Sequence, residues 1–216
     1  DRARASRLDA APELDQLVGP DARSEVRDFI EWFAPFRYAN GKVPCCVDKR
    51  GSDPTPEHDS DGEFIYLVME YYRFTRDRDF LAAMYPRLVK AAGYIDELRS
   101  QCLTEKFRQP EHAHLYGILP PSISHEGYSA HPAHSNWDNL FAMKGLDDVV
   151  SAAEILQAKE LVELTALRDA FHGDFIASIK NSMAVHKIGY IPGAADLGDL
   201  DPTSTTIGLD PANRLA

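Results

Sequence analysis

Cysteine, long apolar runs and basic charge are all scarce in this chain of 216 residues. Its three cysteines, Cys45, Cys46 and Cys102, include no Cys-x-x-Cys pair, so they form neither a disulfide framework nor a zinc-binding motif. No apolar stretch approaches the roughly 20 residues of a transmembrane helix, so no membrane partner is predicted. The net charge of −11 disfavours binding to nucleic acid, because phosphate contacts need a basic face.

The start of the chain gives no indication of the cellular compartment. Residues 1–6 are charged and alanine-rich, and they lack the apolar core of a signal peptide. The overall composition, with 44% hydrophobic and 26% charged residues, is typical of a soluble globular protein. The localisation therefore stays open.

Apolar residues recur at helical spacing in five segments, which predicts an all-α fold. These segments are residues 21–36, 61–75, 80–100, 136–157 and a long stretch that ends near residue 185. The segment 61–75 is apolar almost all round, which is typical of a helix buried on most sides. The segment 80–100 and the one ending near 185 each carry a single apolar stripe, so each is expected to have one side facing water.

Long polar loops alternate with short turns along the chain. Loops at about residues 40–61 and 103–135 each precede a predicted buried helix, which a short turn joins to the next helix. A third loop, at about residues 189–204, is expected to precede another helix. This alternation predicts antiparallel helical hairpins with long loops at one end, arranged as inner and outer layers. An α-solenoid is the other all-α arrangement, but the repeat of fixed period that it requires is missing.

Four stretches of the sequence resemble bacterial members of the six-hairpin glycosidase superfamily. They are GKVPCCVD, PEHDSDGEFIYLVMEYYRFTRDRDFLAAMYPRL, GILPPSISHEGYSAHPAHSNWDN and GDLDPTSTT, which together cover most of residues 40–206. The resemblance implies an (α/α)6 toroid whose active site lies in the loops at the N-termini of the inner helices. Residues 1–216 are then expected to form a single all-helical domain, about half of a toroid. Uncovered apolar sides of its helices would contact the remaining hairpins or a second copy of the chain.

The resemblance also implies a reaction. Enzymes of this architecture mostly hydrolyse glycosidic bonds with inversion, using one carboxyl group as acid and another as base, without a cofactor. The expected substrate is an oligosaccharide or a glycoconjugate. A non-catalytic carbohydrate-binding or incomplete toroid is the alternative, and an epimerase or lyase on the same fold also stays open.

The first candidate site lies just before the helix 61–75. Glu57, His58 and Asp59 are predicted to contact the substrate, and Glu63 is a candidate catalytic carboxylate. A second interpretation of Glu63 is structural. The spacing Ser60-x-x-Glu63 also fits a capping box, in which the two side chains would only complete the start of the helix.

The second candidate site lies at the start of the helix 136–157. Trp137 and Asp138 are similar to the trehalase and processing-glucosidase motif, in which an aspartate beside an aromatic residue is the general acid. The resemblance therefore implies that Asp138 is the acid and that Trp137 and His134 bind the substrate, because aromatic rings stack on the C–H faces of sugars. Here too a capping box, from Ser135 to Asp138, is the structural alternative.

A third candidate site lies in the loop before that helix. Glu126 is a candidate catalytic residue there, and His125 and Tyr128 are candidates for substrate binding. The same loop contains the spacings His-x-His at 112–114 and His-x-x-His at 131–134, which are plausible pairs of metal ligands. No HExxH motif accompanies them, and histidine also hydrogen-bonds sugar hydroxyls, so no metal is predicted.

Overall fold

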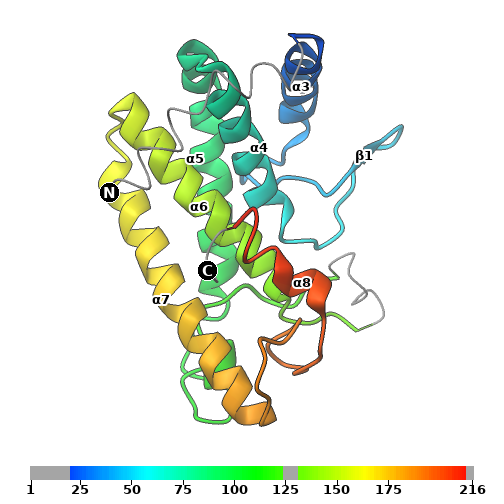
Figure 1. Cartoon of the computed structure of the whole chain (residues 1–216), viewed down its shortest axis with the longest axis vertical. Helices are drawn as coiled ribbons and strands as arrows, with labels where there is room; N and C mark the ends of the chain where they lie inside the picture. The colour runs from blue at the N-terminus through cyan, green and yellow to red at the C-terminus, as the bar shows by residue number, and fades with distance from the viewer. Residues whose placement is uncertain (1–19, 124–130, 213–216) are drawn as a thin grey trace.

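Helices make up nearly all of the regular structure in the computed structural model, which describes residues 20–123 and 131–212. The helices, shown in Figure 1, are α3 (Pro20–Phe33), α4 (Ser60–Thr75), α5 (Arg78–Ser100), α6 (Asn136–Leu156), α7 (Leu161–His186) and α8 (Pro202–Thr206). Two short 3-10 helices, η1 (Ala34–Phe36) and η2 (Ala113–Leu115), complete the set. The prediction of an all-α fold is confirmed, and all five predicted helices are present.

A small β-hairpin in the first long loop was not predicted. The strands β1 (Val47–Asp48) and β2 (Gly51–Ser52) pair antiparallel, with Val47 opposite Ser52. Gly51 has a φ of +105°, a backbone conformation that glycine adopts without strain. The five-residue α8 follows the third long loop, where the sequence predicted that a further helix begins.

Local signals in the sequence account for the boundaries of the helical pairs. The Asp77 side chain accepts a hydrogen bond of 2.9 Å from the backbone N–H of Phe80 and so caps the start of α5. Arg76, Gln157 and Lys187 follow α4, α6 and α7 with left-handed φ values of 55–57°. A residue in this conformation ends a helix because its N–H turns back to the last free carbonyl groups. The turns that join α4 to α5 and α6 to α7 are therefore short.

α4 and α6 are packed side by side at the centre of the described structure (Figure 1). α4 also contacts α3 and α5, and α6 also contacts α5, α7 and α8. A Cβ atom at Gly62 would lie 2.1 Å from the carbonyl oxygen of Phe141, and one at Gly145 would lie 2.7 Å from the Cα of Gly62. The two backbones are thus in contact, and only glycine fits at this crossing.

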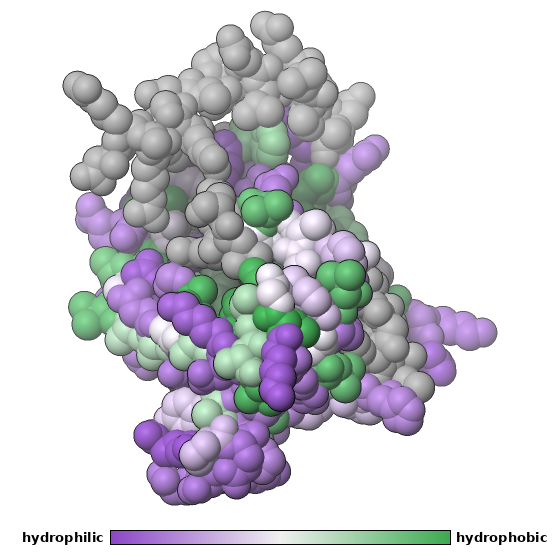
Figure 2. Space-filling model, turned by 60° about the horizontal axis from the view of Figure 1, so that its bottom comes forward, coloured by the Kyte–Doolittle hydropathy of each residue, from purple (hydrophilic) through white to green (hydrophobic). Residues whose placement is uncertain are grey.

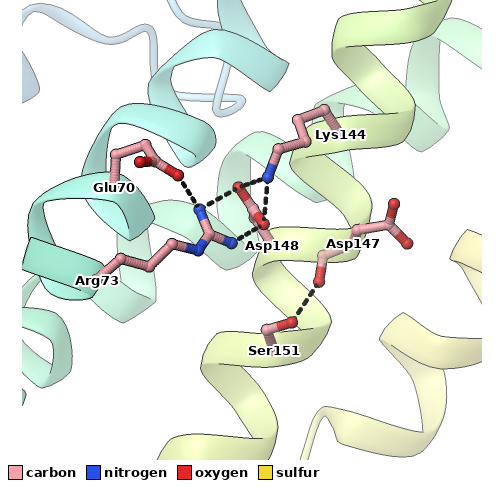
Figure 3. Close-up of polar contacts among 6 residues, drawn as sticks. All are labelled: Glu70, Arg73, Lys144, Asp147, Asp148 and Ser151. Carbon is pink, nitrogen blue, oxygen red and sulfur yellow. Dashed lines mark hydrogen bonds and ion pairs between the residues drawn. The ribbon is translucent and has the colours of Figure 1, made fainter. Parts of the chain in front are cut away.

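An ion-pair network joins α4 and α6 further along (Figure 3). The Asp148 carboxylate, 2% exposed, accepts hydrogen bonds from the Arg73 guanidinium and, at 2.7 and 2.8 Å, from the Lys144 ammonium. Glu70 binds the same guanidinium at 2.6 Å. Because Gly62 meets Phe141 and Arg73 meets Asp148, the contacts advance in the same direction along both helices. α4 and α6 are therefore parallel, and their N-termini lie at the same end.

The three long loops meet at that end. The Ile123 N–H donates a hydrogen bond to the carbonyl of Pro56, which joins the second loop to the first. The Asn136 N–H donates to the carbonyl of Gly193, at 2.8 Å, which joins the start of α6 to the third loop. This loop-bearing end is the part of the molecule where the candidate residues of the sequence gather.

Apolar residues are also found on the surface. Large apolar side chains with roughly half or more of their area exposed occur on α3 (Phe29, Trp32), on α7 (Val162, Val185) and near the third loop (Leu197, Leu200, Leu209). On the face drawn in Figure 2, apolar groups lie among polar ones. In the described part of the chain, no helix has the length and apolar character needed to cross a membrane.

Candidate carboxylate site

The starts of α4 and α6 are joined by a side-chain hydrogen bond. The indole Nε1–H of Trp137 donates to Oδ2 of Asp59 at 2.8 Å, and the Ser60 hydroxyl lies 3.3 Å from Oδ1 of the same carboxylate. The Trp137 ring also contacts the ring of Phe141 edge to face, with 5.1 Å between centroids. Asp59 and Trp137, both predicted to bind substrate, are thus brought together.

Asp138 is fully buried behind this contact. Its Oδ2 accepts a hydrogen bond from the Ser122 hydroxyl, and its Oδ1 has no hydrogen-bond partner among the described residues. Burial raises the pKa of Asp138 well above its ordinary value, and the negative charges of Asp59, Glu57 and Glu63 raise it further, against the lowering effect of Ser122. Asp138 therefore holds its proton to a higher pH than an exposed aspartate does.

Glu63 lies in the first turn of α4 and is half-buried. Burial, followed by the charges of Asp59 and Glu57, raises its pKa to about 7. Glu63 also lines a cavity of about 380 Å³ between α3, the loop around Val43 and the start of α4. It is therefore a carboxyl group that is poised between its protonated and ionised forms and that a ligand can reach.

The capping-box interpretation of Glu63 is wrong. The helix begins one residue earlier than that motif requires, so Ser60 is inside α4 and Asp59 occupies the cap position. The Asp59 side chain makes no capping hydrogen bond, and the backbone N–H of Glu63 bonds to the carbonyl of Asp59. The Glu63 carboxyl group is free of that structural role.

The cap at the start of α6 is present only in part. The Ser135 hydroxyl accepts a hydrogen bond of 3.4 Å from the backbone N–H of Asp138, as predicted for a capping serine. The reciprocal contact is missing, because the Asp138 carboxyl binds Ser122 and the Ser135 N–H bonds to Ala133. Asp138 is therefore directed away from the cap and into the site.

Two further residues, one just before α4 and one in its first turn, are buried in structural positions. His58 is 5% exposed, and its ring hydrogen-bonds the backbone carbonyl of Pro121. Burial, and next the charge of Lys42, lowers the pKa of His58 to about 4, so the ring is neutral at pH 7. Asp61, fully buried, accepts the backbone N–H of Val43 at 2.9 Å and anchors the loop to α4.

His134 has a partner outside the carboxylate cluster. Its Nδ1 lies 3.1 Å from Oδ2 of Asp196, and its backbone N–H bonds to Oδ1 of the same residue. His134 therefore connects the start of α6 to the third loop, and no contact between it and the candidate carboxylates is seen in the described residues. His125, Glu126 and Tyr128 lie outside the described residues.

The chain was compared with protein-family models, with curated proteins and with solved structures. None of them matches it. The resemblance to six-hairpin glycosidases therefore remains a prediction that is carried by the sequence stretches themselves.

Metal binding has no support in the geometry. Across residues 20–123 and 131–212, no three His, Cys, Asp or Glu side chains are grouped closely enough to hold an ion. His114 packs its ring against His186 with centroids 6.0 Å apart, and His134 binds Asp196.

Sequence reasoning missed Ser122. This residue is fully buried, pairs with Ala133 in an isolated β-bridge and donates its hydroxyl to Asp138. It lies in a long loop with no periodic pattern, so no feature of the sequence distinguishes it from the other serines. The cavity beside Glu63 was also missed, because its wall combines residues from α3, from the loop before α4 and from α6.

Proposed function

We propose that this chain carries the carboxylate site of an inverting glycoside hydrolase, on part of an (α/α)6 toroid. The observation that carries the proposal is Glu63, a half-buried carboxyl group with a pKa of about 7 on the wall of a cavity, beside Asp59. General acids in glycosidases have raised pKa values so that they hold a proton at neutral pH. Inversion is taken from the resemblance.

We assign the acid to Glu63 and the base to Asp59. An acid and a base in one site are recognised as two neighbouring carboxyl groups whose surroundings give them different pKa values. Asp59 holds its carboxylate against the indole N–H of Trp137, and its charge favours the protonated form of Glu63. Asp138, which the resemblance favoured as the acid, is fully buried, so we propose that it acts through Asp59 as a positioning residue.

The proposed toroid is supported by three features. The helices α4 and α6 are parallel neighbours, α5 and α7 return antiparallel beside them, and the three long loops meet at one end. The exposed Phe29 and Trp32 on α3 are where we expect further hairpins or a second copy to pack.

A non-catalytic carbohydrate-binding role is the second candidate. The observation that favours it is burial: Asp138, the acid that the resemblance implies, is fully buried and does not meet a substrate directly. This role predicts saturable sugar binding without turnover. Trp137, which is half-buried, would then supply the stacking surface.

The deciding experiment is reducing-sugar release from a panel of oligosaccharides and glycoconjugates. Wild type is compared with Glu63→Gln, Asp59→Asn and Asp138→Asn, with the fold of each checked by circular dichroism. Turnover that falls at least 100-fold in Glu63→Gln and Asp59→Asn supports the proposal. Turnover that survives Glu63→Gln but not Asp138→Asn returns the acid role to Asp138, and sugar binding without turnover supports the binding role.

A further inference from the structure

The cavity beside Glu63 has a wall that is unusual for a sugar subsite. Its volume of about 380 Å³ is large enough for a small ring system, and most of its lining is apolar. Phe33, Phe64, Leu67 and Phe141 contribute rings and methyl groups. The polar side chains at the wall are few, namely Ser60, Glu63 and Tyr66.

A sugar ring does not suit such a wall. Each hydroxyl of a sugar needs a hydrogen-bond partner, and a buried hydroxyl without one costs about 1–3 kcal/mol. An aromatic or alkyl group needs no such partners, and its burial is favourable by about 25 cal/mol per Å² of apolar surface. The lining therefore selects an apolar group.

The Glu63 carboxyl group is placed to orient an apolar ligand in the cavity. No hydrogen bond or ion pair to its carboxyl group is seen in the described residues, although it lines the cavity and feels the charges of Asp59 and Glu57. A carboxyl group left available at the edge of an apolar cavity is suited to meet the one polar atom of an otherwise apolar ligand. In a glycoside with an apolar aglycone, that atom is the glycosidic oxygen.

The position of the cavity relative to the rest of the site agrees with this arrangement. Phe141 belongs to the cavity wall and contacts the ring of Trp137, whose indole N–H binds Asp59. The apolar cavity thus adjoins the polar part of the site through one pair of aromatic rings. A glycoside would place its sugar toward Trp137 and Asp59 and its aglycone toward Phe141 and Leu67.

We infer that the cavity is an aglycone subsite and that the substrate class is aryl or alkyl glycosides. This inference rests on the proposed function for its chemistry. The Glu63 proton moves to the glycosidic oxygen as the bond from that oxygen to the anomeric carbon breaks, and the bonding electron pair stays on the oxygen. Water adds to the anomeric carbon and loses its proton to Asp59. The products are a phenol or alcohol and the free sugar.

The first test measures the cavity without any turnover. Binding of 2-naphthol, a neutral aromatic probe, is followed by fluorescence in wild type, Leu67→Trp and Val162→Trp. Leu67 lines the cavity and is half-buried, so an indole there fills it, whereas Val162 on α7 is 81% exposed and serves as the matched control. We expect saturable binding to wild type and Val162→Trp, weakened at least tenfold in Leu67→Trp. If Leu67→Trp fails to fold by circular dichroism, Cys45→Phe fills the cavity from the loop before α4.

The second test compares 2-naphthyl and methyl glycosides of the same sugar. In wild type we expect kcat/KM to be at least tenfold higher for the naphthyl glycoside than for the methyl glycoside. In Leu67→Trp, where the cavity is filled, this ratio of kcat/KM values should fall to the value that the different reactivity of the two leaving groups alone produces. Absence of saturable 2-naphthol binding, or equal binding to Leu67→Trp, overturns the inference. Probe binding without turnover of any glycoside supports the cavity and counts against the proposed function. Turnover of oligosaccharides without probe binding supports the proposed function and counts against the aglycone subsite.

Discussion

Trp137 donates its indole N–H to the carboxylate of Asp59, 78 positions away in the sequence, at 2.8 Å. This bond joins the cap residue of α4 to the first turn of α6 at the loop-bearing end of the molecule. A hydrogen bond to a charged group contributes about 1.5–3 kcal/mol. Trp137→Phe keeps a ring against Phe141 but removes the donor. We therefore expect a loss of about 2 kcal/mol in the free energy of unfolding, measured by urea denaturation. An unchanged value would mean that this bond is not formed in solution.

The raised pKa of Glu63 predicts how stability changes with pH. Its pKa is about 7 in the folded chain against 4.5 for an unperturbed glutamate, so between these values the folded state binds more protons than the unfolded state. The free energy of unfolding contributed by Glu63 is then highest below pH 4.5 and falls as the pH rises to 7. A shift of this size corresponds to on the order of 3 kcal/mol.

The test compares wild type with Glu63→Gln across that range of pH. The variant cannot ionise, so its stability relative to wild type should rise from pH 4.5 to pH 7 and then level off. Urea denaturation at intervals of half a pH unit gives the difference. Parallel curves for the two proteins would show that Glu63 titrates normally.

His58 predicts a pH effect of the opposite sign. Its pKa is lowered from 6.5 to about 4, so between these values the unfolded chain binds more protons than the folded one. Stability linked to His58 is fully present above pH 6.5 and is lost as the pH falls toward 4. We expect His58→Gln to flatten this acid limb, as measured by thermal unfolding between pH 4 and 7. A limb that keeps its slope in the variant would assign the effect to other groups.

The contact between Gly62 and Phe141 predicts a large cost for one added methyl group. Gly62→Ala would place a Cβ 2.1 Å from the Phe141 carbonyl oxygen, so α4 and α6 must move apart. We expect a loss of about 3 kcal/mol, at the upper end of the usual cost of overpacking. Gly93→Ala in α5 is the matched control, because no atom lies within 4 Å of its added Cβ. That variant should be stabilised by about 0.5–1 kcal/mol through helix propensity.

The Asp148 network in Figure 3 predicts strong destabilisation when its anion is removed. Asp148→Ala leaves Arg73 and Lys144 close together in a largely buried position without their shared carboxylate. Removal of one partner from a buried ion pair costs about 3–5 kcal/mol. Asp48→Ala, which breaks an exposed pair with Arg50, is the control and should leave the melting temperature unchanged. Equal effects in both variants would contradict the structural account.

The helices could be predicted from sequence because their apolar spacing repeats over many residues. The segment 80–100 differs from α5 (Arg78–Ser100) by two residues at its start. The strands β1 and β2 could not be predicted, since two residues each give no period to recognise. For Glu63, an error of one residue in the helix start was enough to suggest a capping box that is not there.

Several residues of the candidate site could be predicted from the sequence, but the contacts between them could not. Asp59 and Trp137 were singled out by residue type and by their place before helices, but their contact depends on how α4 and α6 cross. That crossing is set by Gly62 and Gly145, whose role appears only when the two backbones are placed together. The contacts of Ser122 with Asp138 and of Asp196 with His134 join residues far apart in the sequence, and no local pattern encodes them.

The start of α6 also has a consequence for the order in which the chain matures on the ribosome. Asn136 bonds through its backbone to Gly193 and through its side chain to Pro192, while the carbonyl of His134 receives the N–H of Ala195. These partners are synthesised some 60 residues after the positions that they complete. α4 and α5 can pair early in translation. The polar groups at the start of α6 stay hydrogen-bonded to water until Ala195 has left the exit tunnel. A chain that terminates before that residue would lack α8 and would leave these hydrogen bonds at the start of α6 unmade.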